Sequence, residues 1–228
     1  MLRDLDHPNI VQYLGSEQTP TSYSLFMEYL PGGTIASYVQ KYGKLSDELT
    51  LYFTCQLLDG IDYIHSQNIV HRNLTSAHIL IDASGSCKIS SFGLARRCGQ
   101  VFKDSVSITG SAFYMPPEAI SNKNVSGNNG TKYDIWSAGC VVLEMCTGRR
   151  PWNDMEAMAV LLKLYQAEES PGPPPGTTLS AESADFCKLC FISDPAERPS
   201  ASELKSHGFA VVPTGWSLSG VSQALAES

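Results

Sequence analysis

Residues 69–80 of this chain read IVHRNLTSAHIL, and a second short stretch at residues 91–93 reads SFG. In the longer stretch, apolar residues stand at both ends of a polar segment. This pattern predicts a chain that leaves a helix, makes a tight loop and then enters a short buried strand. The polar residues of the loop are therefore the first candidates for a functional site.

A long helix is predicted to precede this loop. Residues 46–49 read SDEL, which is typical of a helix start because Ser46 can cap the first turn. The apolar residues that follow share one stripe of the helix and predict a single buried face: Leu49, Phe53, Leu57, Ile61 and Ile64. After the loop, residues 79–81 and 87–89 flank a turn and predict a small hairpin.

The other segments predict an α+β fold that is mainly helical. Two strands at residues 10–14 and 23–29 are predicted to pair as a hairpin. Further helices are predicted at 34–42, at 134–145, which is apolar nearly all round, at 179–192 and at 200–207. Asn-, Gly- and Ser-rich residues 121–131 predict a surface loop, and residues 169–176 a proline-rich connection.

Composition narrows the class of protein. The chain has 228 residues, of which 43% are hydrophobic and 17% charged, so it can bury one sizeable core. A net charge of −7 without a dense Lys/Arg run argues against nucleic acid or an anionic membrane as the main partner. The sequence has neither an apolar run of membrane-spanning length nor a signal-peptide core, which predicts a cytoplasmic chain.

The seven cysteines are scattered through apolar segments, as buried thiols in a reducing compartment are. Cys187 and Cys190 form a CxxC pair, but no second pair of ligands lies near it in the sequence. We therefore predict no metal site in this chain.

The loop at residues 69–80 resembles the catalytic loop of eukaryotic protein kinases, HRDLKxxN, and SFG at residues 91–93 resembles their DFG motif. YMPPE at residues 114–118 looks like the family's APE, and DPAERP at residues 194–199 resembles its DPxxRP. The resemblance covers residues 1 to about 210. Gly32-Gly33 and DPAERP are similar to the MAP kinase kinase kinase branch of the Ser/Thr kinases.

The resemblance implies a division of the chain. Residues 1–30 would be the last two strands of a kinase small lobe with the hinge, residues 31–210 a kinase-like large lobe, and residues 211–228 a tail. The adenine pocket would be formed by Met27, Glu28, Leu30 and Leu80. It also implies structural roles: Asp134 would hold the loop backbone, Glu118 would pair with Arg198, and His71, Phe92 and Gly93 would pack the loop and the SFG turn.

The polar positions of the catalytic motifs differ from the family pattern. Asn73 stands at the catalytic aspartate, Thr75 at the lysine, His78 at the metal-binding asparagine and Ser91 at the DFG aspartate. An amide has no useful basicity, and Mg²⁺ prefers oxygen ligands, ideally carboxylates. We therefore expect no cofactor; an active enzyme would require ATP and Mg²⁺.

An activation segment is expected between residues 95 and 113. In the family the arginine at the position of Arg72 holds a phosphorylated residue of this segment, and the candidates for phosphorylation here are Ser105, Ser107, Thr109 and Ser111. The alternative is an arginine that is solvated or hydrogen-bonded without any phosphate.

Three hypotheses follow. The first is a pseudokinase that acts by binding other proteins, such as kinases of a MAP kinase cascade. The second is a Ser/Thr kinase represented by an incomplete chain, because the glycine-rich loop, the lysine and the helix that precede the first strand in the family are missing. The third is a gene remnant without a selected function. The two N-terminal strands would leave an apolar edge unpaired, which predicts self-association or a partner on that edge.

Overall fold

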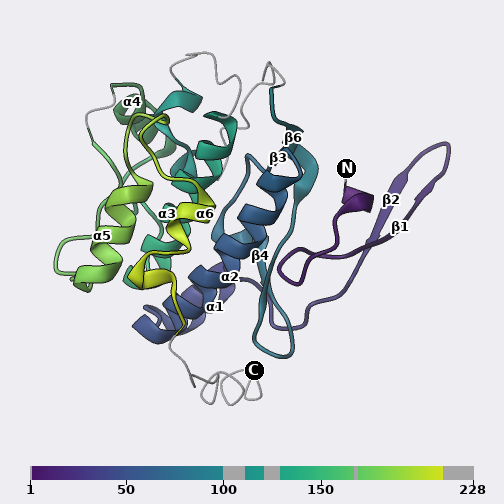
Figure 1. Cartoon of the computed structure of the whole chain (residues 1–228), viewed down its shortest axis with the longest axis horizontal. Helices are drawn as coiled ribbons and strands as arrows, with labels where there is room; N and C mark the ends of the chain where they lie inside the picture. Colours follow the sequence, from purple (N-terminus) through teal and green to yellow (C-terminus); the bar gives the residue numbers. More distant parts are fainter. Residues whose placement is uncertain (1, 100–110, 121–128, 167–168, 213–228) are drawn as a thin grey trace.

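The computed structural model describes residues 2–99, 111–120, 129–166 and 169–212. It is an α+β structure that is mainly helical, as predicted. Figure 1 shows the helices gathered into one body and a two-stranded ribbon that extends from one side of it, next to the N-terminus. Within these described ranges, none of the helices has the length and apolar character that crossing a bilayer would require.

Helix α2, Asp47–Ser66, precedes the central loop as expected. The Ser46 side chain caps it by accepting a hydrogen bond from the backbone N–H of Leu49. Its buried face includes Phe53, Leu57 and Ile61, which are each at most 1% exposed. The shorter helix α1, Ile35–Tyr42, begins with a capping box between Thr34 and Ser37.

Helix α3, Asn129–Thr147, forms the centre of the core. Every residue from 134 to 147 is buried, which explains why this segment is apolar nearly all round. Helix α5, Ala181–Cys190, packs closely against it at Gly139. A Cβ at Gly139 would lie only 2.5 Å from the Cβ of Cys190, so the two helices could not approach this closely with a larger residue.

Two helical predictions need correction. Helix α4, Ala157–Gln166, was not predicted; it buries Val160 and Leu164 but exposes a second apolar stripe, so its sequence shows no clean amphipathic pattern. The helix expected at 200–207 is only Ala201–Leu204, α6. It ends early because the His207 side chain accepts a hydrogen bond from the N–H of Phe209 and caps the 3-10 turn η6, Gly208–Ala210.

The N-terminal hairpin forms, but its first strand is displaced from the predicted 10–14. Strand β1, Tyr13–Gln18, pairs antiparallel with β2, Tyr23–Met27. Ile10 and Val11 are each 2% exposed and join the body instead, where the Val11 N–H donates to the carbonyl of Ile89 at 2.9 Å. Burial in the core therefore took these residues out of the ribbon.

The strands around the central loop are short. The predicted hairpin is β4, Ile79–Ile81, paired with β5, Cys87–Ile89. Strand β3, Ile69–Val70, pairs with β6, Arg96–Arg97, which the sequence did not indicate. Short 3-10 turns complete the described chain: η1 (Leu2–Asp4), η2 (Ser76–His78), η3 (Phe92–Leu94), η4 (Ser111–Tyr114) and η5 (Pro117–Ala119).

Several expectations fall partly outside the described residues. Of the predicted surface loop at 121–131, residues 121–128 lie outside the described ranges and residues 129–131 belong to α3. Most of the expected tail, from residue 213 onward, also lies outside them. The described cysteines, all seven of the chain, are free thiols.

The predicted ion pair between Glu118 and Arg198 is present and buried. Arg198 is 0% exposed, and its two terminal nitrogens reach the two carboxylate oxygens of Glu118 at 2.7 and 3.2 Å. The same guanidinium donates to the carbonyls of Lys132 and Ile192 and lies 5.1 Å from the ring centroid of Trp136. This pair joins η5 to the chain after α5.

Arg198→Met is expected to lower the free energy of unfolding by about 3–5 kcal/mol, because it leaves the Glu118 carboxylate buried without its partner. Adding Glu118→Leu should recover part of this loss, and urea unfolding of the single and double variants measures the coupling. Lys205→Met is the control: its ion pairs with Asp59 and Asp62 are at the surface, so its cost should stay below about 1 kcal/mol. Additive costs of the two Glu118–Arg198 substitutions would contradict the prediction.

Candidate functional site

The central loop is held by the buried carboxylate of Asp134 on α3. Its Oδ2 accepts a hydrogen bond from the backbone N–H of His71 and its Oδ1 one from that of Arg72, both at 2.8 Å. His65 on α2 donates a third, from Nε2 to Oδ2 at 2.9 Å. To direct both loop N–H groups at one carboxylate, Arg72 adopts a left-handed conformation with φ of 67°, which is unfavourable for a residue with a side chain.

His71 connects the loop to the SFG turn. Its ring is fully buried; Nε2 donates to the carbonyl of Ser90 at 2.7 Å, and Nδ1 accepts the N–H of Asn73 at 3.3 Å. These partners require the neutral imidazole with its proton on Nε2. Burial lowers the pKa of His71 and favours the same neutral form. The ring also meets Phe92 edge to face, with centroids 4.8 Å apart.

Three of the four altered catalytic positions lie together. Asn73, Thr75 and His78 line one pocket of about 590 Å³. Nδ1 of His78 donates to the backbone carbonyl of Asn73 at 2.7 Å, so this nitrogen has no lone pair left for a metal ion. Thr75, 6% exposed, precedes the turn η2.

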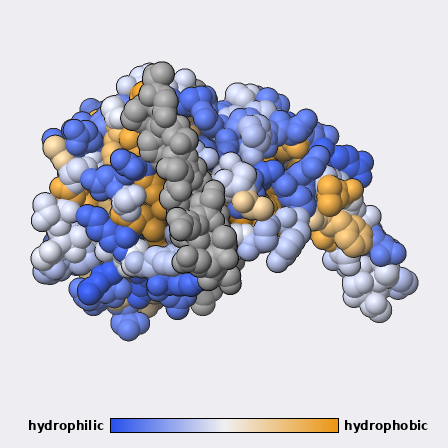
Figure 2. All heavy atoms as spheres, turned by 90° about the horizontal axis from the view of Figure 1, so that it is seen from below, coloured by the Kyte–Doolittle hydropathy of each residue, from blue (hydrophilic) through white to orange (hydrophobic). Residues whose placement is uncertain are grey.

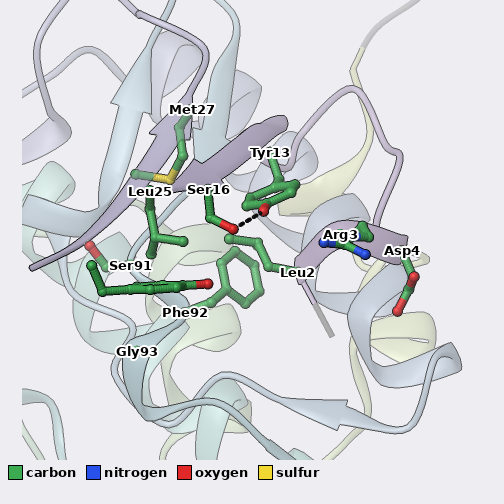
Figure 3. Close-up of a pocket in the computed structure, with 11 residues that line it drawn as sticks. Leu2, Arg3, Asp4, Tyr13, Ser16, Leu25, Met27, Ser91, Phe92 and Gly93 are labelled. Carbon is green, nitrogen blue, oxygen red and sulfur yellow. Dashed lines mark hydrogen bonds between the residues drawn. The ribbon is translucent and has the colours of Figure 1, made fainter. Parts of the chain in front are cut away.

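The fourth altered position, Ser91, lies apart from this group. It lines a second pocket, of about 560 Å³, between the ribbon and the SFG turn. Figure 3 shows Phe92, Leu2 and Leu25 pointing toward one another in this pocket, with Met27 on the β2 side. Ser91, like Arg72, has a left-handed backbone, with φ of 66°. The residue after His71 and the residue before Phe92 are therefore both in a strained conformation.

The residues expected around adenine differ in their exposure and do not all line one pocket. Met27 lines the Ser91 pocket and is 42% exposed, whereas Leu30 is 7% exposed and Leu80 lies in β4. The carboxylate of Glu28 is bound by Lys88 at 2.8 and 2.9 Å, and its backbone N–H donates to the carbonyl of Gln12. A nucleotide would therefore have to do without the backbone N–H of Glu28.

The expected activation segment is described only at its ends. Ser105, Ser107 and Thr109 lie outside the described residues, whereas Ser111 lines the pocket of Asn73. Arg72 donates from one guanidinium nitrogen to the carbonyl of Leu94 at 3.5 Å. A role for Arg72 in binding a phosphorylated segment stays a prediction.

A buried polar network in the Asn73 pocket was not predicted from the sequence. The Tyr114 hydroxyl donates to Glu144 Oε2 at 2.6 Å and, having given its proton there, accepts one from Ser76 Oγ at 3.1 Å. Burial raises the pKa of Glu144, and burial together with the neighbouring Glu144 carboxylate raises that of Tyr114. The available signal was that Glu144 is a charged residue within the otherwise apolar part of α3.

The donor set does not fit Mg²⁺. That ion needs near-octahedral oxygen coordination, usually with one or two carboxylates. Asp134 is occupied by three hydrogen bonds, Glu144 is bound to Tyr114, and Ser91 offers a neutral hydroxyl in the other pocket. In the part of the chain that the structure covers, no three His, Cys, Asp or Glu side chains are grouped so that they could hold a metal ion.

The His71 imidazole is expected to stay neutral well below pH 6.5, because protonating Nδ1 would direct a second donor at the Asn73 N–H. Since its pKa is lower in the folded than in the unfolded state, its contribution to stability is complete above about pH 6.5. Stability is then lost as the pH falls toward the folded-state pKa, at up to about 1.4 kcal/mol per pH unit.

NMR of the His71 ring during an acid titration measures this directly, with urea unfolding at each pH. A His7→Gln background removes a second histidine whose pKa burial lowers. A ring that titrates near pH 6.5 would contradict the assigned hydrogen bonds.

Comparison with known proteins agrees with this framework. The model of the protein kinase domain matches residues 1–210. The Ser/Thr-protein kinase BCK1/SLK1/SSP31 of Saccharomyces cerevisiae is 41% identical over 92% of this chain and 14% of its own length. MAP kinase kinase kinase mkh1 of Schizosaccharomyces pombe is 42% identical over 92% of this chain and 19% of its own length.

A plant protein gives a similar match. Mitogen-activated protein kinase kinase kinase 5 of Arabidopsis thaliana is 38% identical over 98% of this chain and 31% of its own length. The chain thus spans less than a third of each of these relatives. From the domain match and these identities, together with the loop held by Asp134, the chain belongs to the protein kinase family.

Proposed function

We propose that this chain is a pseudokinase: a kinase-family domain that does not transfer phosphate and that acts by binding proteins of a cytoplasmic MAP kinase cascade. One observation carries the proposal. The loop backbone is held by Asp134 in an ordered arrangement, yet the side chain that it presents at the catalytic aspartate position is the amide of Asn73. The division into residues 1–30, 31–210 and 211–228 belongs to the same proposal.

The loss of the aspartate removes the group that would accept the substrate's proton. General base catalysis contributes roughly 10² to 10⁴ in rate, and an amide cannot provide it. His78 stands at the position of the family's metal-binding asparagine and not at that of the base, and its Nδ1 donates to the backbone carbonyl of Asn73. His71 is neutral, but it is fully buried and both its nitrogens are bonded.

The metal positions support the same conclusion. In the family, Mg²⁺ neutralises the charge that develops on the phosphates, and it is held by an aspartate and an asparagine. Here these positions carry Ser91 and His78, which offer a neutral hydroxyl and an imidazole. Imidazole nitrogen suits transition metals better than Mg²⁺. With neither base nor metal, binding is the activity that this scaffold retains.

The partners are inferred from the relatives. Two of those described above are named as MAP kinase kinase kinases, so the proposed partners are kinases of such a cascade. The negative net charge of the chain is compatible with a protein partner and unfavourable for nucleic acid.

The second candidate is an ATP- and Mg²⁺-dependent Ser/Thr kinase. The names of the relatives favour it, since each is called a kinase, and so does the intact framework of Asp134, His71 and the Glu118–Arg198 pair. It requires catalysis to proceed with Asn73, His78 and Ser91 in place of the family residues.

Phosphate transfer from ATP to a generic protein substrate separates the two candidates. We expect no Mg²⁺-dependent transfer by this chain, and no rise in Tm when ATP and Mg²⁺ are added together. The matched control is the triple variant Asn73→Asp, His78→Asn and Ser91→Asp, which restores the oxygen ligands and should raise Tm with ATP only when Mg²⁺ is present. Mg²⁺-dependent transfer by the unaltered chain, lost in Asn73→Ala, would establish the second candidate instead.

A further inference from the structure

Another pocket is formed by α3, α5 and the connection between α4 and α5. It has a volume of about 490 Å³, which is within the range of small-molecule sites. It shares no lining residue with the pockets of Asn73 and Ser91. All of its lining residues lie between residues 143 and 191, so this pocket is built by internal segments of the matched domain.

Apolar side chains form the floor of this pocket. Leu143 on α3 is 1% exposed, Cys187 on α5 is 4% exposed, and Phe191 at the end of α5 is 7% exposed. Burial raises the pKa of the Cys187 thiol, so the thiol stays protonated and the floor carries no charge. An apolar group that enters the pocket is therefore removed from water without the burial of a charge.

The connection between α4 and α5 gives the pocket a rigid wall. Pro171 and Pro173 line it, and each proline ring fixes its own φ angle. The connection then makes a tight turn, in which the N–H of Thr177 donates to the carbonyl of Pro174 at 3.0 Å and Gly176 has the φ of 82° that a type II turn needs. The pocket thus has its shape before a ligand enters, so binding orders few additional groups.

The rim of the pocket distinguishes it from an ordinary apolar patch. On the face drawn in Figure 2, hydrophobic residues reach the surface in small patches bordered by hydrophilic ones, so apolar surface alone does not mark a ligand site. The exposed residues Ser170, Thr178 and Lys188 line this pocket, as does Thr177. In the part of the chain that the structure describes, none of these four side chains has a hydrogen bond or an ion pair, so all four are available to a ligand.

Nearby acidic residues are bound to other groups. Asp185, one turn before Lys188 on α5, accepts a hydrogen bond from Nε2 of His207 at 3.1 Å. Glu169, in the connection between α4 and α5, forms an ion pair with Lys163. The positive charge of Lys188 is therefore left for an anionic group of the ligand.

We propose that this pocket binds a small amphipathic monocarboxylate, whose apolar body lies on the floor and whose carboxylate is held by Lys188 and the hydroxyl groups of the rim. An ammonium and hydroxyl groups can all donate to carboxylate oxygens. Lys188 lies in the last turn of α5, where the backbone carbonyls carry partial negative charge. That charge disfavours a doubly charged group such as a phosphate monoester, whereas one lysine balances one carboxylate. The site is independent of whether the domain transfers phosphate.

Titration of the full chain with octanoate, followed by amide NMR spectra, tests this site. We expect saturable shifts at Ser170, Thr178 and Lys188 and none in the pocket of Asn73. Octanol and octylammonium are the matched ligands, because they carry the same apolar chain with a neutral or a cationic end. Octanol should bind roughly tenfold more weakly than octanoate, since it cannot form a charge-assisted bond with Lys188, and octylammonium more weakly still.

Substitutions separate the charge from the apolar floor. Lys188→Gln should lower the affinity for octanoate about tenfold, to that for octanol, and Lys188→Arg should retain it. Lys205→Gln is the matched control, because it removes a surface lysine that does not line the pocket, and it should leave the affinity unchanged. Ala184→Phe adds a ring at an exposed lining position, so it should abolish the binding of both ligands while Tm stays within about 2 °C.

Three results would overturn the proposal. The first is an equal affinity for octanoate and octanol that Lys188→Gln does not change, which would leave an apolar pocket without a carboxylate site. The second is tighter binding of octyl phosphate than of octanoate, which would assign the site to phosphate esters. The third is the absence of saturable shifts at Ser170 and Thr178 throughout the millimolar range of octanoate.

Discussion

The buried carboxylate of Asp134 is the interaction on which the rest of the site depends. It accepts hydrogen bonds from two consecutive backbone N–H groups of the loop and from the imidazole of His65, and Asp134 itself is 0% exposed. Burying these backbone N–H groups without a partner would be costly, so the loop is fixed to α3 whatever side chains it carries. His71 then extends this constraint to Ser90 and Phe92, and the strained backbones of Arg72 and Ser91 are held by the same contacts.

Burial explains which family features this chain keeps. Asp134, His71 and Arg198 are each 0% exposed, and replacing any of them would leave a buried donor or acceptor without a partner. Ser91 is exposed, and Asn73 and His78 are partly exposed, so substitutions there have little effect on folding. The buried framework therefore does not depend on which side chains stand at these three more exposed positions.

The sequence predicted most of the framework, because its signals are local or come from motifs. The stripe on α2, the apolar run of α3, the β4–β5 hairpin and the Glu118–Arg198 pair are all present. Three features did not follow from the sequence, two of them because they depend on contacts between distant segments. Ile10 and Val11 were assigned to the ribbon because nothing local shows their bonds to Ile89, α4 was missed because both its faces are apolar, and Glu144 was missed because its partner Tyr114 lies 30 residues away.

The Glu118–Arg198 pair also has a consequence for biosynthesis. The two residues are separated by 80 positions, so the carboxylate leaves the ribosome long before its guanidinium partner exists. Until that partner is translated, packing Glu118 into its native place would bury a lone charge, and η5 must stay hydrated. The nascent chain consequently completes its core only when nearly the whole domain has been made. Chaperones can bind the incomplete domain in the time between the synthesis of Glu118 and that of Arg198.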